Sequence, residues 1–131
     1  MKGIVPKPPA RSRQAVPVFF WHCTPMSRLP GILGRGMVPG DKGWIYLSDC
    51  RGTAENYAGM FHPETAVVLR IAGAALDEAR LGPDDDDLAD LLGQRRGGRR
   101  WHDLGWRESL AVCGQCTYAG TIPPAAITVL S

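Results

Sequence analysis

The sequence predicts an α+β domain built from several short strands and two or three short helices. Several apolar runs are rich in β-branched and aromatic residues, which favour strands. Other segments repeat apolar residues at the spacing of three and four positions that is typical of an amphipathic helix. Pairs of glycine and proline separate these segments, and 131 residues are sufficient for one modest core. We therefore expect one domain over residues 16–131, preceded by a flexible basic arm at 1–15.

The expected strands begin directly after the proline-rich arm. The first is the run from Val16 to Trp21, which is expected to end at His22. The clearest is the run from Thr65 to Ile71, because nearly all of its residues are apolar or β-branched. The complete set of expected strands is 16–21, 44–48, 65–71, 109–118 and 126–130.

Helical periodicity is present in two segments. The first helix is expected over residues 26–35, and Gly34 and Gly36 are expected to end it. A second helix is expected over 53–60, and residues 86–92 are long enough for one or two helical turns.

Glycine and proline mark the remaining segments as loops and turns. A loop is expected to break at Gly82 and Pro83, and the run 93–100 (GQRRGGRR) is expected to be flexible. Gly120 and the pair Pro123-Pro124 predict a turn before the last strand.

The charge of the chain excludes little by itself. A formal net charge of +2 is too small to indicate nucleic-acid binding. The run from Asp84 to Asp87 does not have the spacing of a calcium loop, so we interpret it as a surface loop. No apolar run approaches the roughly 20 residues that a membrane span needs, and no signal-peptide pattern is present. We therefore expect a cytoplasmic protein with no membrane partner.

The four cysteines do not form the pattern of a structural metal site. Cys113 and Cys116 form one C-x-x-C pair, whereas Cys23 and Cys50 lie far upstream and apart. A structural zinc site usually has two such pairs, and this pair falls within an expected strand, where residues three apart point to opposite faces. We expect no metal and four reduced, mostly buried thiols.

The segment from His22 to Met37 (HCTPMSRLPGILGRGM) has the first functional signal. The motif begins with a histidine that ends a strand, followed by a small residue and a hydroxyl residue. The helix that comes next ends with Ile-Leu and a glycine. This pattern resembles the first motif of the ADP-ribosyltransferases of the His-Tyr-Glu class, which includes the poly(ADP-ribose) polymerases and the DNA-modifying DarT toxins. The resemblance implies a split β-sheet with short flanking helices and a pocket for NAD.

Two further segments, GWIYLSD at 43–49 and TAENYA at 53–58, resemble the second motif of this class. Tyr46 and Tyr57 keep the family interval of eleven residues. In the family, these tyrosines clamp the nicotinamide ring, with each aromatic contact worth about 0.5–1.5 kcal/mol, and the histidine bonds the adjacent ribose. Backbone groups of the residue after the histidine, here Cys23, hold the carboxamide. The implied cofactor-binding residues are His22, Cys23, Thr24, Tyr46, Ala54 and Tyr57.

The segment from Val112 to Ile127 resembles the closing strand of DarT-like sequences, in which a glutamate stands seven residues before an Ile-Pro-Pro turn. Counting back seven residues from Ile122 reaches Gln115. The resemblance therefore implies a catalytic set of His22, Tyr46 and Gln115. Glutamine can keep the hydrogen bond that the family glutamate makes to the ribose, but it has no charge and cannot take a proton.

The alignment that selects Gln115 as the catalytic position has two alternatives. A shift of two residues would select Cys113, and Glu108 is the nearest carboxylate upstream of Gln115. Glu108 and Gln115 are an odd number of residues apart, so they share a strand face only if a bulge separates them.

The expected function is transfer of ADP-ribose from NAD to a macromolecular acceptor, such as DNA or RNA, in a toxin or phage setting with a possible antitoxin partner. Gln115 leaves open a non-catalytic module that binds NAD or ADP-ribose, and an RNA 2′-phosphotransferase is a weaker alternative. An arginine cluster before the closing strand is either a solvated loop or a grip for acceptor phosphates. Its members are Arg95, Arg96, Arg99 and Arg100.

Overall fold

The computed structural model describes residues 16–61, 65–84 and 105–130. The arm at 1–15, the helical turns at 86–92 and the Arg95–Arg100 cluster lie outside the described residues. None of the helices that are described is long and apolar enough to cross a membrane.

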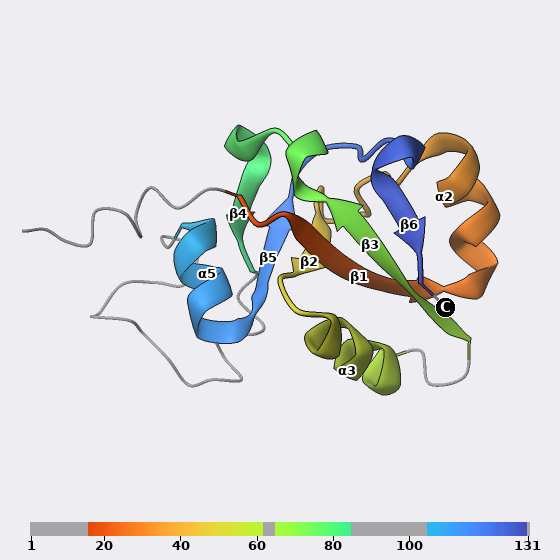
Figure 1. The fold of residues 1–131 in the computed structure, drawn as a ribbon, viewed down its shortest axis with the longest axis horizontal. Coiled ribbons are helices and arrows are strands. Elements are labelled where there is room, and N and C mark those ends of the chain that lie inside the picture. The colour runs from red at the N-terminus through yellow and green to blue at the C-terminus, as the bar shows by residue number, and fades with distance from the viewer. Residues whose placement is uncertain (1–15, 62–64, 85–104, 131) are drawn as a thin grey trace, which may run out of the picture.

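The described chain is an α+β domain with one six-stranded antiparallel sheet (Figure 1). The strands are β1 (Phe19–Pro25), β2 (Ile45–Ser48), β3 (Ala66–Ala72), β4 (Leu81–Pro83), β5 (Gln115–Tyr118) and β6 (Ile127–Val129). Their order across the sheet is β4-β5-β2-β1-β3-β6. The α-helices are α2 (Leu29–Arg35), α3 (Arg51–Phe61) and α5 (Trp106–Cys113). The 3₁₀ turns are η1 (Met26–Arg28), η2 (Gly73–Ala75), η3 (Glu78–Arg80) and η6 (Pro124–Ala126).

The sheet has two well-paired halves that meet at a short joint. β1 pairs with β3 along its whole length, and β2 pairs with β5 along its whole length. Between the two halves, the register of β1 and β2 has the single pair Trp21↔Ser48. Beyond this pair the two strands separate, so that the backbone from His22 onward leaves β2.

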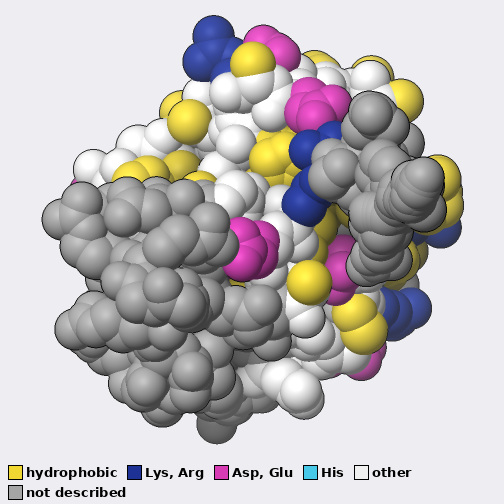
Figure 2. Space-filling view, turned by 90° about the vertical axis from the view of Figure 1, so that its left-hand side faces the viewer, with side chains coloured by type: hydrophobic (Ala, Val, Ile, Leu, Met, Phe, Trp, Pro, Cys, Tyr) yellow, Lys and Arg dark blue, Asp and Glu magenta, His cyan; other side chains and the backbone are white. Residues whose placement is uncertain are grey.

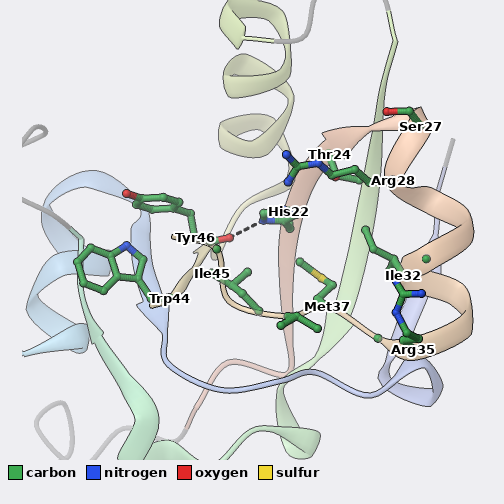
Figure 3. A pocket seen from close by; sticks show the side chains of 14 residues that line it. His22, Thr24, Ser27, Arg28, Ile32, Arg35, Met37, Trp44, Ile45 and Tyr46 are labelled. Atoms are coloured by element: carbon green, nitrogen blue, oxygen red, sulfur yellow. Dashed lines mark hydrogen bonds between the residues drawn. The ribbon is translucent and has the colours of Figure 1, made fainter. Parts of the chain in front are cut away.

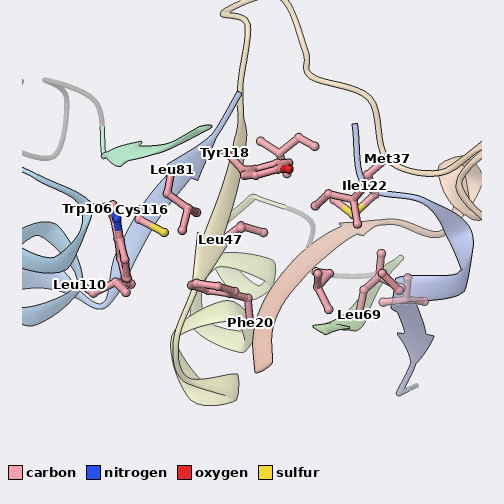
Figure 4. Packing of buried hydrophobic residues seen from close by; sticks show 14 residues of the cluster. Phe20, Met37, Leu47, Leu69, Leu81, Trp106, Leu110, Cys116, Tyr118 and Ile122 are labelled. Atoms are coloured by element: carbon pink, nitrogen blue, oxygen red, sulfur yellow. The ribbon is translucent and has the colours of Figure 1, made fainter. Parts of the chain in front are cut away.

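The hydrophobic core covers one face of the sheet (Figure 4). Phe20, Leu47 and Leu69 are completely buried there, and they come from three neighbouring strands. Trp106 and Leu110 of α5 pack into the same cluster. Burial of side chains of this size stabilises the fold by about 1.5–3 kcal/mol for each residue.

The expected strand over 109–118 is wrong in its first half. Residues from Trp106 to Cys113 form α5, which Gly114 ends in a left-handed conformation (φ 75°), and β5 then begins at Gln115. The buried residues Trp106 and Leu110 lie one helical turn apart, which is the periodicity that the β-rich composition concealed.

Three smaller expectations also need correction. β1 does not end at His22 but continues to Pro25, because β3 supplies a pairing partner for each of its residues. Gly34 lies inside α2, and Gly36 alone caps it. Pro83 belongs to β4 rather than to a loop, and β4 is an edge strand, where a proline that lacks an N–H donor is tolerated.

Candidate functional site

A pocket of about 660 Å³ lies where β1 and β2 separate. β1 contributes His22 and Thr24 to its wall, and β2 contributes Ile45 and Tyr46. The turn η1, the helix α2 and the loop that leads to Trp44 complete the lining (Figure 3). The volume falls within the range of about 300–1,000 Å³ that is typical of small-molecule sites.

A short hydrogen bond links His22 across this gap to β2. Its Nδ1 lies 2.6 Å from the main-chain oxygen of Tyr46, and Figure 3 shows this bond linking the two walls. A carbonyl oxygen only accepts, so Nδ1 must carry the proton, and Nε2 is then the acceptor atom of the neutral ring. The arrangement orients His22 to receive a hydrogen bond from a ligand hydroxyl.

Tyr46 is half-buried and lies on the β2 side of the pocket. Lys42 donates a hydrogen bond to its hydroxyl at 3.3 Å, and the ammonium group lies 5.9 Å from the centre of the ring. These contacts are exposed, so they orient the tyrosine ring more than they stabilise the fold.

Two arginines that the sequence did not single out also line the pocket. Arg28 lies in η1 and Arg35 in the last turn of α2. Among the described residues, neither guanidinium has an ion-pair partner, and no carboxylate lines this pocket. The surface near β4 and α5 is different, because acidic and basic side chains lie side by side there and Arg107 pairs with Glu78 at 2.7 Å (Figure 2). The pocket is therefore positively charged and suited to an anionic ligand.

Gly31 explains how Arg35 reaches its position. A Cβ at residue 31 would lie 3.0 Å from one terminal nitrogen of the Arg35 guanidinium. The arginine therefore turns back along α2 over a residue without a side chain. The spacing of these two residues, i and i+4 on a helix, could have indicated the contact, but only the fold shows that it faces a pocket.

Gln115 is the first residue of β5, outside the lining of this pocket. It pairs with Ser48, and residues that pair directly share a sheet face, so Gln115 lies on the same face as Tyr46. Its side chain is 2% exposed, and its Nε2 has no hydrogen-bond partner within the described residues. A buried amide without a partner costs about 1–3 kcal/mol, and such costs are often found at functional positions.

Ser109 of α5 positions the backbone of Gln115. The Ser109 hydroxyl donates to the main-chain oxygen of Gln115 at 2.6 Å and accepts from the main-chain nitrogen of Asp84 at 2.9 Å. The side chain of Ser109 is completely buried. One hydroxyl therefore joins α5 to the ends of β4 and β5.

The other residues with an expected role lie near the site but do not all line it. Thr24 lines the pocket and is 3% exposed. Cys23 lies between His22 and Thr24 with its side chain on the opposite face of β1, and Ala54 is buried on α3. Neither belongs to the lining. Tyr57 belongs to α3, but its side chain lies outside what the structure describes.

The cysteines differ in burial, so the expectation of mostly buried thiols holds only for Cys116. Cys50 is exposed, while Cys23 and Cys113 are half-buried, and all four are free thiols. Burial raises the pKa of Cys23, Cys113 and Cys116. The main-chain N–H of Thr53, followed by that of Gly52, lowers the pKa of Cys50.

The two cysteines of the C-x-x-C pair lie in different elements of the fold. Cys113 ends α5, whereas Cys116 lies in β5, so the pair does not lie within one strand as expected. Among the described residues, no group of three or more histidine, cysteine or acidic side chains could hold a metal ion.

A comparison with models of known protein families finds no match, and a comparison with curated proteins finds no relative.

Proposed function

We propose that the pocket binds NAD and that the chain is an ADP-ribosyltransferase-like protein. One observation supports this proposal most strongly. His22, oriented by the main-chain oxygen of Tyr46, shares a pocket of about 660 Å³ with two arginines that have no ion-pair partner among the described residues. Hydrogen-bond acceptors for sugar hydroxyls and cations for phosphates are the two kinds of group that NAD requires.

The parts of NAD match different walls of the pocket. Arg35 supplies a cation for the pyrophosphate, since guanidinium groups bind phosphate oxygens with paired N–H donors. Nε2 of His22 accepts a hydrogen bond from a ribose hydroxyl. Tyr46 offers an aromatic face for the nicotinamide ring. The short joint between β1 and β2 is consistent with the split sheet that the resemblance implies.

The chemistry at Gln115 determines whether the bound NAD reacts. In the proposed reaction, the bond between ribose C1′ and nicotinamide breaks, an acceptor atom bonds to C1′, and a base takes the acceptor's proton. Gln115 is buried and lies outside the lining of the pocket, and its uncharged amide cannot be that base. We therefore propose slow transfer, and the uncharged amide also favours a second candidate, a module that binds NAD without cleaving it.

Titration calorimetry with NAD and the full chain tests the binding step. We expect saturable binding that His22→Ala weakens by about 10- to 100-fold, because a hydrogen bond in a desolvated pocket and its orientation are both lost. Arg51→Gln is the matched control, since Arg51 is exposed on α3 and pairs with Glu55. An absence of NAD binding by the unmodified chain would contradict the proposal.

Nicotinamide release and transfer of labelled ADP-ribose to cell lysate then separate the two candidates. Release with transfer indicates an enzyme, whereas binding without either indicates a binding module. Gln115→Glu restores the carboxylate that the family uses, so it should raise the rate of nicotinamide release. If NAD binds but this variant is inert, the assignment of the catalytic position to Gln115 is wrong.

A further inference from the structure

We infer that His22 is the catalytic base of the proposed transfer, and that it takes the proton of the acceptor through the ribose hydroxyl that it binds. This inference rests on the proposed function, because it assigns one step of that reaction to a residue of the same pocket. The role goes beyond a hydrogen bond to the ribose, and it requires no carboxylate at the position of Gln115.

The described lining of the pocket offers one side chain that can take a proton near neutral pH. Arginine and tyrosine side chains are already protonated in that range, and the hydroxyl groups of serine and threonine are very weak bases. The other described lining residues are apolar, glycine or tryptophan, and none is an aspartate or a glutamate. His22 is half-buried, so a ligand in the pocket can reach its ring. The base of the described pocket is therefore His22.

The hydrogen bond to Tyr46 determines which ring nitrogen takes the proton. The main-chain oxygen of Tyr46 accepts from Nδ1 at 2.6 Å, so the lone pair of the neutral ring is on Nε2. When Nε2 takes a proton, the ring becomes a cation and the hydrogen bond from Nδ1 becomes charge-assisted, which strengthens it. The carbonyl also fixes the orientation of the ring, as the third group of a catalytic triad does.

His22 lies at the end of the pocket where the reacting ribose is proposed to bind. Figure 3 shows it beside Tyr46, whose ring offers a face to the nicotinamide. Nicotinamide is bonded to ribose C1′, and the hydroxyl on the neighbouring carbon is the 2′-hydroxyl. A nicotinamide on Tyr46 therefore brings the 2′-hydroxyl, rather than the 3′-hydroxyl, closest to Nε2 of His22.

The proton moves in two linked transfers. The bond between C1′ and nicotinamide breaks, and its electron pair leaves with nicotinamide. An acceptor oxygen, from water or from a hydroxyl group, bonds to C1′ and gives its proton to the 2′-oxygen, while the proton of the 2′-hydroxyl passes along its hydrogen bond to Nε2. The 2′-hydroxyl is unchanged at the end, and His22 returns the proton to solvent. General base catalysis of this kind typically contributes about 10²–10⁴-fold to a rate.

Nicotinamide release from NAD by the full chain, with water as the acceptor, tests this inference. His22→Gln keeps an amide oxygen that can accept the ribose hydrogen bond but cannot take a proton. KM for NAD should therefore change by less than about 5-fold, while kcat falls by at least about 100-fold. Arg51→Gln, at an exposed position on α3, is the control and should change neither value. Thermal melts check that each variant folds.

Chemical rescue separates a base from a residue that only positions the ribose. His22→Ala leaves space in the pocket for a small base. Imidazole added to the buffer should raise kcat of His22→Ala at saturating NAD by at least about 10-fold, and it should leave kcat of the unmodified chain unchanged.

The possible failures are distinct. If NAD binds but the unmodified chain releases no nicotinamide, the inference is overturned and NAD binding is retained. A loss in kcat below about 10-fold for His22→Gln, or no effect of imidazole on His22→Ala, also overturns it. If NAD does not bind, the proposed function fails together with the inference.

Discussion

Gly36→Ala is expected to destabilise the protein strongly, because Gly36 caps α2 and begins the loop that leads to Trp44. Its backbone has φ 93° and ψ 178°, a conformation that residues with a side chain rarely adopt. A Cβ at this position would overlap the main-chain oxygen of Ile122 and lie 3.2 Å from Cδ of Pro124. That oxygen accepts the hydrogen bond from Met37 at 2.9 Å, so relief of the overlap disturbs the bridge between Met37 and Ile122.

The size of the destabilisation follows from the strained backbone and from the disturbed bridge. The unfavourable backbone conformation costs about 1–3 kcal/mol. The bridge has two main-chain hydrogen bonds, between Met37 and Ile122 in both directions, and each is worth about 1 kcal/mol. Together they lower the free energy of unfolding by roughly 3–5 kcal/mol, which for a chain of this length corresponds to a fall in Tm of roughly 10–20 °C.

Gly34→Ala is the matched control, two residues earlier in the same helix. A Cβ at Gly34 would have no heavy atom within 4 Å, so the change should add up to about 1 kcal/mol of helix propensity. Urea unfolding followed by circular dichroism measures both variants. If Gly36→Ala stays within about 1 kcal/mol of the unmodified protein while Gly34→Ala behaves as expected, the reasoning about Gly36 is refuted.

Three further predictions concern buried and titratable groups. Ser109→Ala should lower the free energy of unfolding by about 2–4 kcal/mol, because two hydrogen bonds are lost. The control Ser27→Ala, at an exposed position, should have little effect. Equal urea midpoints for the two variants would contradict this prediction. Desolvation raises the pKa of Asp49 above 3.8, so its charged form destabilises the fold as pH rises through the shifted pKa. Asp49→Asn should therefore raise Tm near pH 7 but not at pH 3, and a gain that is the same at both pH values would be inconsistent with this cause. Iodoacetamide should alkylate the exposed Cys50 first and the buried Cys116 last, as followed by mass spectrometry, and a reversed order would show that burial and pKa do not control reactivity here.

The sequence motifs predicted only part of the candidate site. The motif around His22 and Tyr46 predicted two residues that do line one pocket and that are joined by a hydrogen bond. It did not predict the arginines, because Arg28 ends η1 and Arg35 ends α2, and their spacing in the sequence does not show that both face one pocket. Their convergence on one pocket depends on how α2 packs against η6 and the core. The role of Gln115 stays a prediction from the resemblance.

Several strands and helices of the α+β fold could be predicted from neighbouring residues alone. β3 and α2 were expected close to their observed bounds, because alternation and helical spacing depend on neighbouring residues only. The same holds for the turn before β6, where Pro123 and Pro124 restrict the backbone directly.

Features that depend on distant residues could be read only from the fold. β4 is a strand because β5, more than thirty residues later, pairs with it, and α5 is a helix because Trp106 and Leu110 find a core to fill. The separation of β1 from β2, which opens the pocket, likewise depends on which strands pair along their whole length. Such pairing depends on long-range contacts, and local periodicity carries no information about them.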